Sequence, residues 1–85
     1  MPSIAEFLGM WITINWGDHN PPHIHIKAGE FMATMTIKDA KLLSGFLPSS
    51  KLKILQKWVR LHHDDLMDNW KLAQEQKPLH KIEGL

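Results

Sequence analysis

The chain has 85 residues, a formal net charge of +1 and no cysteine. A chain this short builds its core from a few large side chains, and without cysteine it has no disulfide framework, zinc-thiolate site or thiol nucleophile. The charge is far from that of a dedicated nucleic-acid binder, and no apolar run approaches the roughly 20 residues needed to cross a membrane. We therefore expect a single cytoplasmic domain over residues 1–85, with histidine and carboxylate as its available metal ligands.

The first half of the chain alternates apolar and polar residues, as β-strands do. Three strands and a short fourth one are predicted, at residues 10–16, 23–28, 31–38 and 41–44. Between the second and third strands, Gly29 can adopt the positive φ of a type II′ hairpin turn, which fixes the register. The cross-strand neighbours that follow are His25 opposite Thr34, His23 opposite Thr36, Thr13 beside His25, and Asn15 beside His23.

This alternation divides the predicted sheet into an apolar and a polar face. In the first strand, the side chains expected to point inward are Met10, Ile12, Ile14 and Trp16. The other face is expected to stay open and to carry an exposed aromatic ring among hydroxyl groups, which suits contact with a partner or a second copy. The residues of this predicted interaction surface are Trp11, Thr13, Thr34 and Thr36.

The second half reads as helix, with Ser49 or Ser50 as the N-cap and Pro78 as a stop. Its apolar stripe comprises Leu52, Leu55, Trp58, Val59, His62, Leu66, Trp70 and Ala73. A straight helix of roughly 27 residues would be about 40 Å long, against about 30 Å for a domain of this size. An overhang, an oligomer contact or a break is therefore expected, and residues 62–65 suit a break because Asp64 and Asp65 favour a helix start.

These elements predict an α+β fold, a small antiparallel sheet of three to four strands with a C-terminal helix packed on its apolar face. Within the helix, His62 lies in the apolar stripe. We expect it to be buried and hydrogen-bonded to the backbone or to a neighbour such as Asn69 or Asp65. It should lie on the opposite side of the sheet from His23 and His25.

Residues 18–26, DHNPPHIHI, concentrate three histidines beside two prolines that stiffen the backbone. One hypothesis is simply a solvated polar sheet face. A second is a site for a divalent metal such as zinc, formed by His23 and His25 with His19 or Asp18 as the third ligand.

A third hypothesis for this segment is metal-free acid and base catalysis on a phosphodiester. His23 and His25 would then be the acid and the base, Lys27 would stabilise the phosphate charge, and His19 would orient them. A fourth is binding of a ligand or partner whose chemistry the sequence does not name.

Four segments, MPSIAEFLGM, DHNPPHIHI, LHHDDLMDNW and PLHKIEGL, together resemble the bacterial domain-of-unknown-function family 4160 (DUF4160). The positions that match its motifs are His19, Pro21, Pro22, His23 and His25 in the loop, and His62, Leu66, Asn69 and Trp70 in the helix. The resemblance implies a short bacterial protein, often encoded beside a second small protein as in toxin-antitoxin pairs. The leading hypothesis is an association module of such a pair, binding a small protein partner or itself. A nucleic-acid-related activity at the histidine loop is a further option, and metal binding by His19, His23 and His25 is the alternative.

Overall fold

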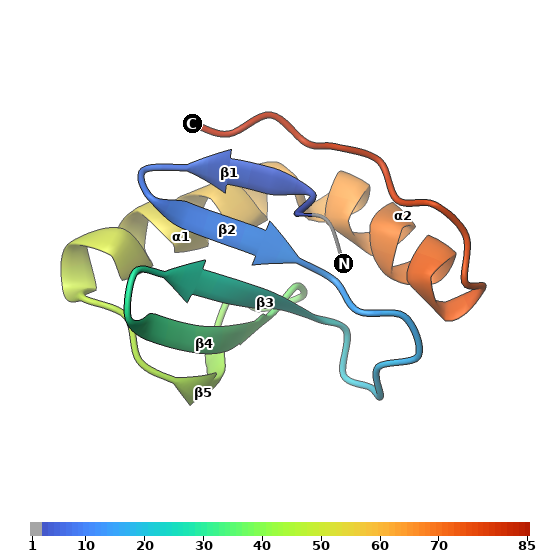
Figure 1. Cartoon of the computed structure of the whole chain (residues 1–85), viewed down its shortest axis with the longest axis horizontal. Helices are drawn as coiled ribbons and strands as arrows, with labels where there is room; N and C mark the ends of the chain where they lie inside the picture. The colour runs from blue at the N-terminus through green and yellow to red at the C-terminus, as the bar shows by residue number, and fades with distance from the viewer. Residues whose placement is uncertain (1–2) are drawn as a thin grey trace.

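A computed structural model describes residues 3–85, which form a five-stranded antiparallel sheet and two helices. The elements are β1 (Ala5–Phe7), β2 (Met10–Thr13), β3 (His23–Ala28), β4 (Phe31–Thr36), β5 (Leu42–Gly45), α1 (Ser49–Leu61) and α2 (His63–Gln74). The strands lie side by side in chain order. Figure 1 shows α1 behind the sheet and α2 running toward the end of the sheet where β2 ends and β3 begins. The predicted α+β fold is confirmed, with five strands instead of three or four.

The strand absent from the sequence-based prediction is β1. It pairs with β2 from Ala5 opposite Ile12 to Phe7 opposite Met10, so that only Leu8 and Gly9 form the turn. Both turn residues have positive φ, 51° and 73°. Two-residue turns of this kind normally begin with Asn, Asp or Gly. Because the first turn position is a leucine, the turn cannot be recognised from the sequence, and neither can the short strand that precedes it.

The core lies between one face of the sheet and the two helices. Its fully buried side chains include Met10, Ile12, Ile24, Ile26 and Met35 from the strands and Leu55, Trp58, Val59 and Leu66 from the helices. The strand residues among them occupy alternate positions, and the helix residues recur at helical spacing, as the two periodicities require. Within residues 3–85, the helices lie on this one side of the sheet, and the opposite face carries neither of them (Figure 1).

The register predicted for the central strands is confirmed. His25 lies between Thr13 on β2 and Thr34 on β4, and His23 lies opposite Thr36. Gly29 has a φ of 59°, as the first centre of a type II′ turn requires.

The predicted extent of the first strand is wrong. The ladder between β2 and β3 ends at Thr13 opposite His25, so Asn15 is not paired with His23. Ile14 stays fully buried beyond the strand, but Trp16, expected inside, is 45% exposed. Strand alternation no longer applies to Trp16, because the chain leaves the sheet before this position.

The break predicted in the helical half is confirmed at His62, which separates α1 from α2. Asp64 and Asp65 lie in the first turn of α2, where the helix dipole stabilises negative charge. The N-cap prediction is wrong. Helix α1 begins at Ser49, and Pro48 precedes it without a side-chain cap. Across residues 3–85, neither helix combines the length and apolar character needed to cross a membrane.

The C-terminal segment, residues 77–85, crosses back over the helices toward β1 (Figure 1). Ile82 donates its backbone N–H to the carbonyl of Ile4, and the indole Nε1 of Trp58 donates to the carbonyl of Glu83. Asn69 also bonds to this segment through the backbone of His80, and thus it is not the partner of His62. His62 is partly exposed, with its Nδ1 3.7 Å from Asp65 Oδ2.

Candidate functional site

Asp18, His23 and His25 converge at the end of the sheet where β3 begins. His25 Nε2 lies 2.8 Å and His23 Nε2 lies 3.4 Å from the same oxygen, Asp18 Oδ2. The two imidazole rings are 5.1 Å apart between centroids. One ligand atom from each of the three side chains lies within 4.8 Å of the others. This triad, as we call these three residues, brings two imidazoles and a carboxylate within reach of one ion.

The backbone carbonyl of Pro21 determines which nitrogen of His23 carries the proton. His23 Nδ1 lies 2.7 Å from that oxygen, and because a carbonyl only accepts hydrogen bonds, Nδ1 must be the donor. In the neutral ring, Nε2 then presents a lone pair toward the Asp18 carboxylate. A metal-bound histidine commonly has the same arrangement, with one ring N–H held by a carbonyl and the other nitrogen on the metal.

Side chains of helix α2 contact two members of the triad, His23 and Asp18. The ring of Trp70 packs against His23 at 5.4 Å between centroids, and Gln74 donates its side-chain N–H to the backbone carbonyl of Asp18 over 2.9 Å. Trp70 and Gln74 are four residues apart, so they lie on the same face of the helix. His23 therefore contacts the helical layer. As the first residue of β3, it lies at the sheet end that α2 reaches.

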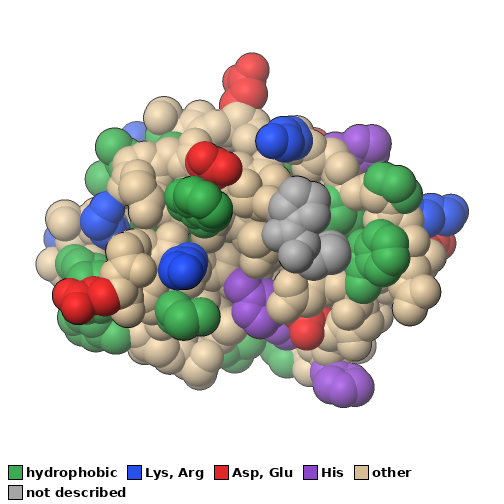
Figure 2. Space-filling model, in the orientation of Figure 1, with side chains coloured by type: hydrophobic (Ala, Val, Ile, Leu, Met, Phe, Trp, Pro, Cys, Tyr) green, Lys and Arg blue, Asp and Glu red, His purple; other side chains and the backbone are tan. Residues whose placement is uncertain are grey.

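The triad is accessible to solvent on one side. The side chains are 14% exposed for His23, 33% for His25 and 25% for Asp18. Figure 2 looks onto the uncovered sheet face and shows histidine side chains beside an acidic one toward this end of the sheet. An ion held by the three residues would therefore keep a coordination position open to water.

Hydroxyl groups and a lysine surround His25 on the uncovered face. Thr13 and Thr34 are its cross-strand neighbours, and Thr34 Oγ1 hydrogen-bonds Ser44 Oγ at 2.8 Å. Lys27 follows two residues later on the same strand and is exposed. Of the predicted interaction surface, Thr13, Thr34 and Thr36 thus lie beside the triad, whereas Trp11 is paired with Lys27 one row of side chains further along.

His19 does not join the triad. It is exposed in the loop that precedes β3 and lies outside the group of ligand atoms that converge. Asp18, weighed from sequence as the other third ligand, occupies that place. The contributions of Trp70 and Gln74 to the site were not predicted from the sequence, although their spacing places them on one helix face.

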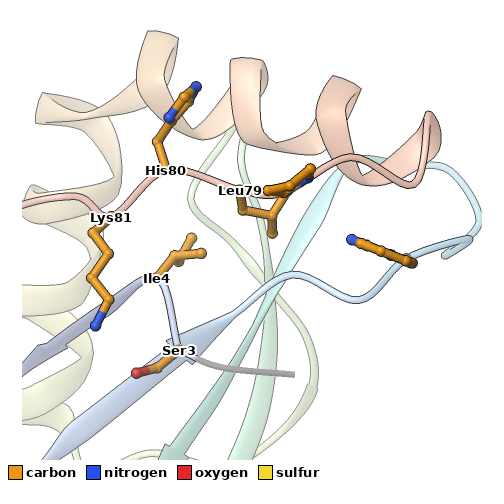
Figure 3. A pocket seen from close by; sticks show the side chains of 7 residues that line it. Ser3, Ile4, Leu79, His80 and Lys81 are labelled. Atoms are coloured by element: carbon orange, nitrogen blue, oxygen red, sulfur yellow. The ribbon is translucent and has the colours of Figure 1, made fainter.

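A concavity of about 300 Å³ lies elsewhere, between the C-terminal segment and the start of β1. Its lining residues are Ser3, Ile4, Trp16, Pro78, Leu79, His80 and Lys81. Figure 3 shows the side chains of His80 and Lys81 extending in opposite directions from the C-terminal segment, which also carries Leu79. Because its polar groups diverge, this concavity is a weaker candidate for chemistry than the triad.

Comparison with protein families gives a match. The model of the family described as domain of unknown function (DUF4160) matches residues 9–71, most of the chain. The chain therefore belongs to this family, and the matched range includes Asp18, His23, His25 and Trp70. No curated protein and no solved structure matches it.

Proposed function

We propose that this DUF4160 domain binds one divalent transition-metal ion through Asp18, His23 and His25. The observation that carries the proposal is the convergence of His23 Nε2 and His25 Nε2 on one carboxylate oxygen, Asp18 Oδ2, at 3.4 and 2.8 Å. Because Nδ1 of His23 bonds the carbonyl of Pro21, Nε2 is the nitrogen that a metal ion beside the carboxylate would use. Two histidines and a carboxylate, with an open position, form a ligand set used by zinc and by non-haem iron.

The distances in the triad agree with the size of such an ion. Ligand atoms on a tetrahedral zinc ion lie about 3.3 Å from one another when the bonds are about 2.0 Å long. The separation of 3.4 Å between His23 Nε2 and Asp18 Oδ2 already has this length. His25 Nε2, at 2.8 Å from Asp18 Oδ2, is in a hydrogen bond that the metal replaces. To reach the tetrahedral separation, His25 and the carboxylate move apart by about half an ångström.

Zinc titration of protein without a histidine tag tests this proposal. We expect one zinc ion per chain by elemental analysis after dialysis. Asp18→Asn keeps the shape of the side chain but removes its charge, and it should weaken zinc binding at least about tenfold in a competition titration with a chelating dye. His25→Ala should have at least the same effect, because it removes a ligand.

The matched control is His19→Ala, which removes a histidine from the same loop but not from the triad. It should leave zinc affinity unchanged. Equal losses in His19→Ala and Asp18→Asn would contradict this ligand set, and wild-type protein that binds no zinc would overturn the proposal itself.

A second candidate function is self-association through β5. This strand lies at the edge of the sheet, and it and the residue after it expose Leu43 at 49% and Phe46 at 61%. An exposed apolar edge strand is a template for pairing with another strand, and a second copy of β5 would supply the same apolar side chains about a two-fold axis. Sedimentation equilibrium should show a dimer that Leu43→Lys converts to monomer. A wild-type monomer at high concentration would exclude this function.

Association with a small protein partner, as in a toxin-antitoxin-like pair, stays a prediction. So do the acid and base roles of His23 and His25, the electrostatic role of Lys27, and a cytoplasmic location. Co-expression with the product of the neighbouring gene tests the first of these. Recovery of both chains from one affinity step, with the tag on either chain, is the expected result.

A further inference from the structure

A second concavity lies on the uncovered sheet face, next to the triad. It has a volume of about 270 Å³ and is lined by Gly9, Trp11, Lys27 and Gly29. Trp11 exposes 55% of its surface there. An added Cβ at Gly29 would meet no atom within 4 Å, so this side of the concavity is open. The space beside the indole therefore admits a flat ring.

The pairing of the strands places this concavity one row of side chains from the triad. Trp11 and Lys27 are direct partners on β2 and β3, and Thr13 and His25 form the next pair on the same face. Residues two positions apart on a strand are separated by roughly 7 Å. A ligand bound to a metal at His25 can therefore extend over Lys27 and reach the ring of Trp11.

We infer that the triad and this concavity together bind a nucleoside monophosphate unit, an inference that rests on the proposed metal site. The phosphate occupies the open position of the metal and contacts the Lys27 ammonium, and the base stacks on the indole of Trp11. A divalent ion and Lys27 carry three positive charges, against the carboxylates of Asp18 and of Glu6, which is paired with Trp11. The hydroxyl groups of Thr13 and Thr34, on either side of His25, supply hydrogen-bond donors for phosphate oxygens.

Calorimetric titration of the zinc-loaded, dialysed protein with adenosine 5′-monophosphate tests this inference. We expect the nucleotide to bind at least about tenfold more tightly than inorganic phosphate or adenosine alone. Trp11→Leu should weaken nucleotide binding about fivefold or more, as loss of a stacking ring does, while leaving inorganic phosphate binding unchanged. Lys27→Met should weaken both.

Trp16→Leu is the matched control, because Trp16 is also exposed but lines the other concavity. It should leave nucleotide affinity unchanged. Equal affinity for nucleotide and phosphate, or no effect of Trp11→Leu, would overturn the inference. Zinc binding measured on the same samples distinguishes this failure from failure of the metal site.

A single-stranded oligoribonucleotide with a 5′-phosphate identifies the source of the nucleotide unit. Binding as tight as that of the free nucleotide, lost when the 5′-phosphate is removed, assigns the site to strand ends. Weaker binding of the oligonucleotide assigns it to free nucleotides.

Discussion

Within residues 3–85, Asn69 is the one buried polar side chain. The nitrogen and the oxygen of its side-chain amide each form a hydrogen bond with the backbone of His80. The distances are 2.9 Å from Nδ2 to the carbonyl of His80 and 2.8 Å from Oδ1 to its N–H. Such a paired contact satisfies donor and acceptor on both partners. It fastens the C-terminal segment to α2 through the backbone, independently of the His80 side chain.

Asn69→Ala should therefore lower the free energy of unfolding by about 2 kcal/mol, because two hydrogen bonds are lost and a small cavity is left. Urea denaturation measures this change. His80→Ala is the control and should change stability by less than about 0.5 kcal/mol, because its backbone groups remain. Equal losses in the two variants would mean that the imidazole, not the backbone pairing, holds the segment.

Gln74 acts on the triad without belonging to it, since its side chain holds the backbone carbonyl of Asp18. Gln74→Ala should weaken zinc binding about tenfold, the usual effect of removing a group that orients a ligand. Gln56→Ala is a matched control, because Gln56 also donates to a backbone carbonyl, that of Ala40, away from the triad. Zinc affinity unchanged in both variants would show that the loop holds Asp18 without help from α2.

Among the elements, the turn between β1 and β2 carries conformational strain. Leu8 has a φ of 51°, a region that costs a residue with a Cβ about 1–2 kcal/mol. Its side chain is 55% exposed, so a smaller polar residue loses little burial there. The turn persists because it joins two strands whose buried residues face the core.

Leu8→Asn should raise the free energy of unfolding by about 1 kcal/mol, because asparagine tolerates this backbone region. Thermal or urea denaturation measures the gain. Leu8→Ala keeps the strain and should give no gain, which separates a backbone effect from the removal of an exposed apolar group. A gain of the same size in both variants would contradict this explanation.

Local chemistry accounts for the elements that could be predicted from sequence. The register of β3 and β4 follows from the turn at Gly29, and the helix break follows from Asp64 and Asp65 after a long apolar stripe. The strand β1 could not be predicted, because Leu8 occupies a turn position where asparagine or glycine is normally found. The exposure of Trp16 could not be predicted either. The alternation of buried and exposed residues ends where β2 stops pairing with β3, which is before this position.

The candidate site was predictable only in part, for a related reason. His23 and His25 share a face because they lie two apart on one strand, which the sequence shows directly. The choice of Asp18 over His19 depends on the path of the loop. That path depends on contacts with α2, some 50 residues further along the chain. Local propensity contains no information about such contacts.

In the whole molecule, the triad joins three parts of the fold: the loop before β3, the strand itself and α2 behind it. A ligand that binds only this folded arrangement stabilises it by mass action. At a free zinc concentration 100 times the dissociation constant, the gain is about 2.7 kcal/mol. For a domain of this size, that corresponds to a rise of about 10 °C or more in melting temperature.

Differential scanning calorimetry with and without zinc measures this rise, and Asp18→Asn should abolish most of it. A rise of the same size in that variant would place the stabilising zinc somewhere other than the triad.

The most direct measurement of the central claim is the position of the metal in crystals of the zinc-loaded protein, located by anomalous scattering at the zinc edge. One peak is expected about 2.0–2.2 Å from Asp18 Oδ2, His23 Nε2 and His25 Nε2, with solvent or an anion in the remaining position. The Asp18–His25 hydrogen bond should be absent in those crystals. A zinc-saturated crystal with no peak at the triad, and with that hydrogen bond still at 2.8 Å, would contradict the central claim.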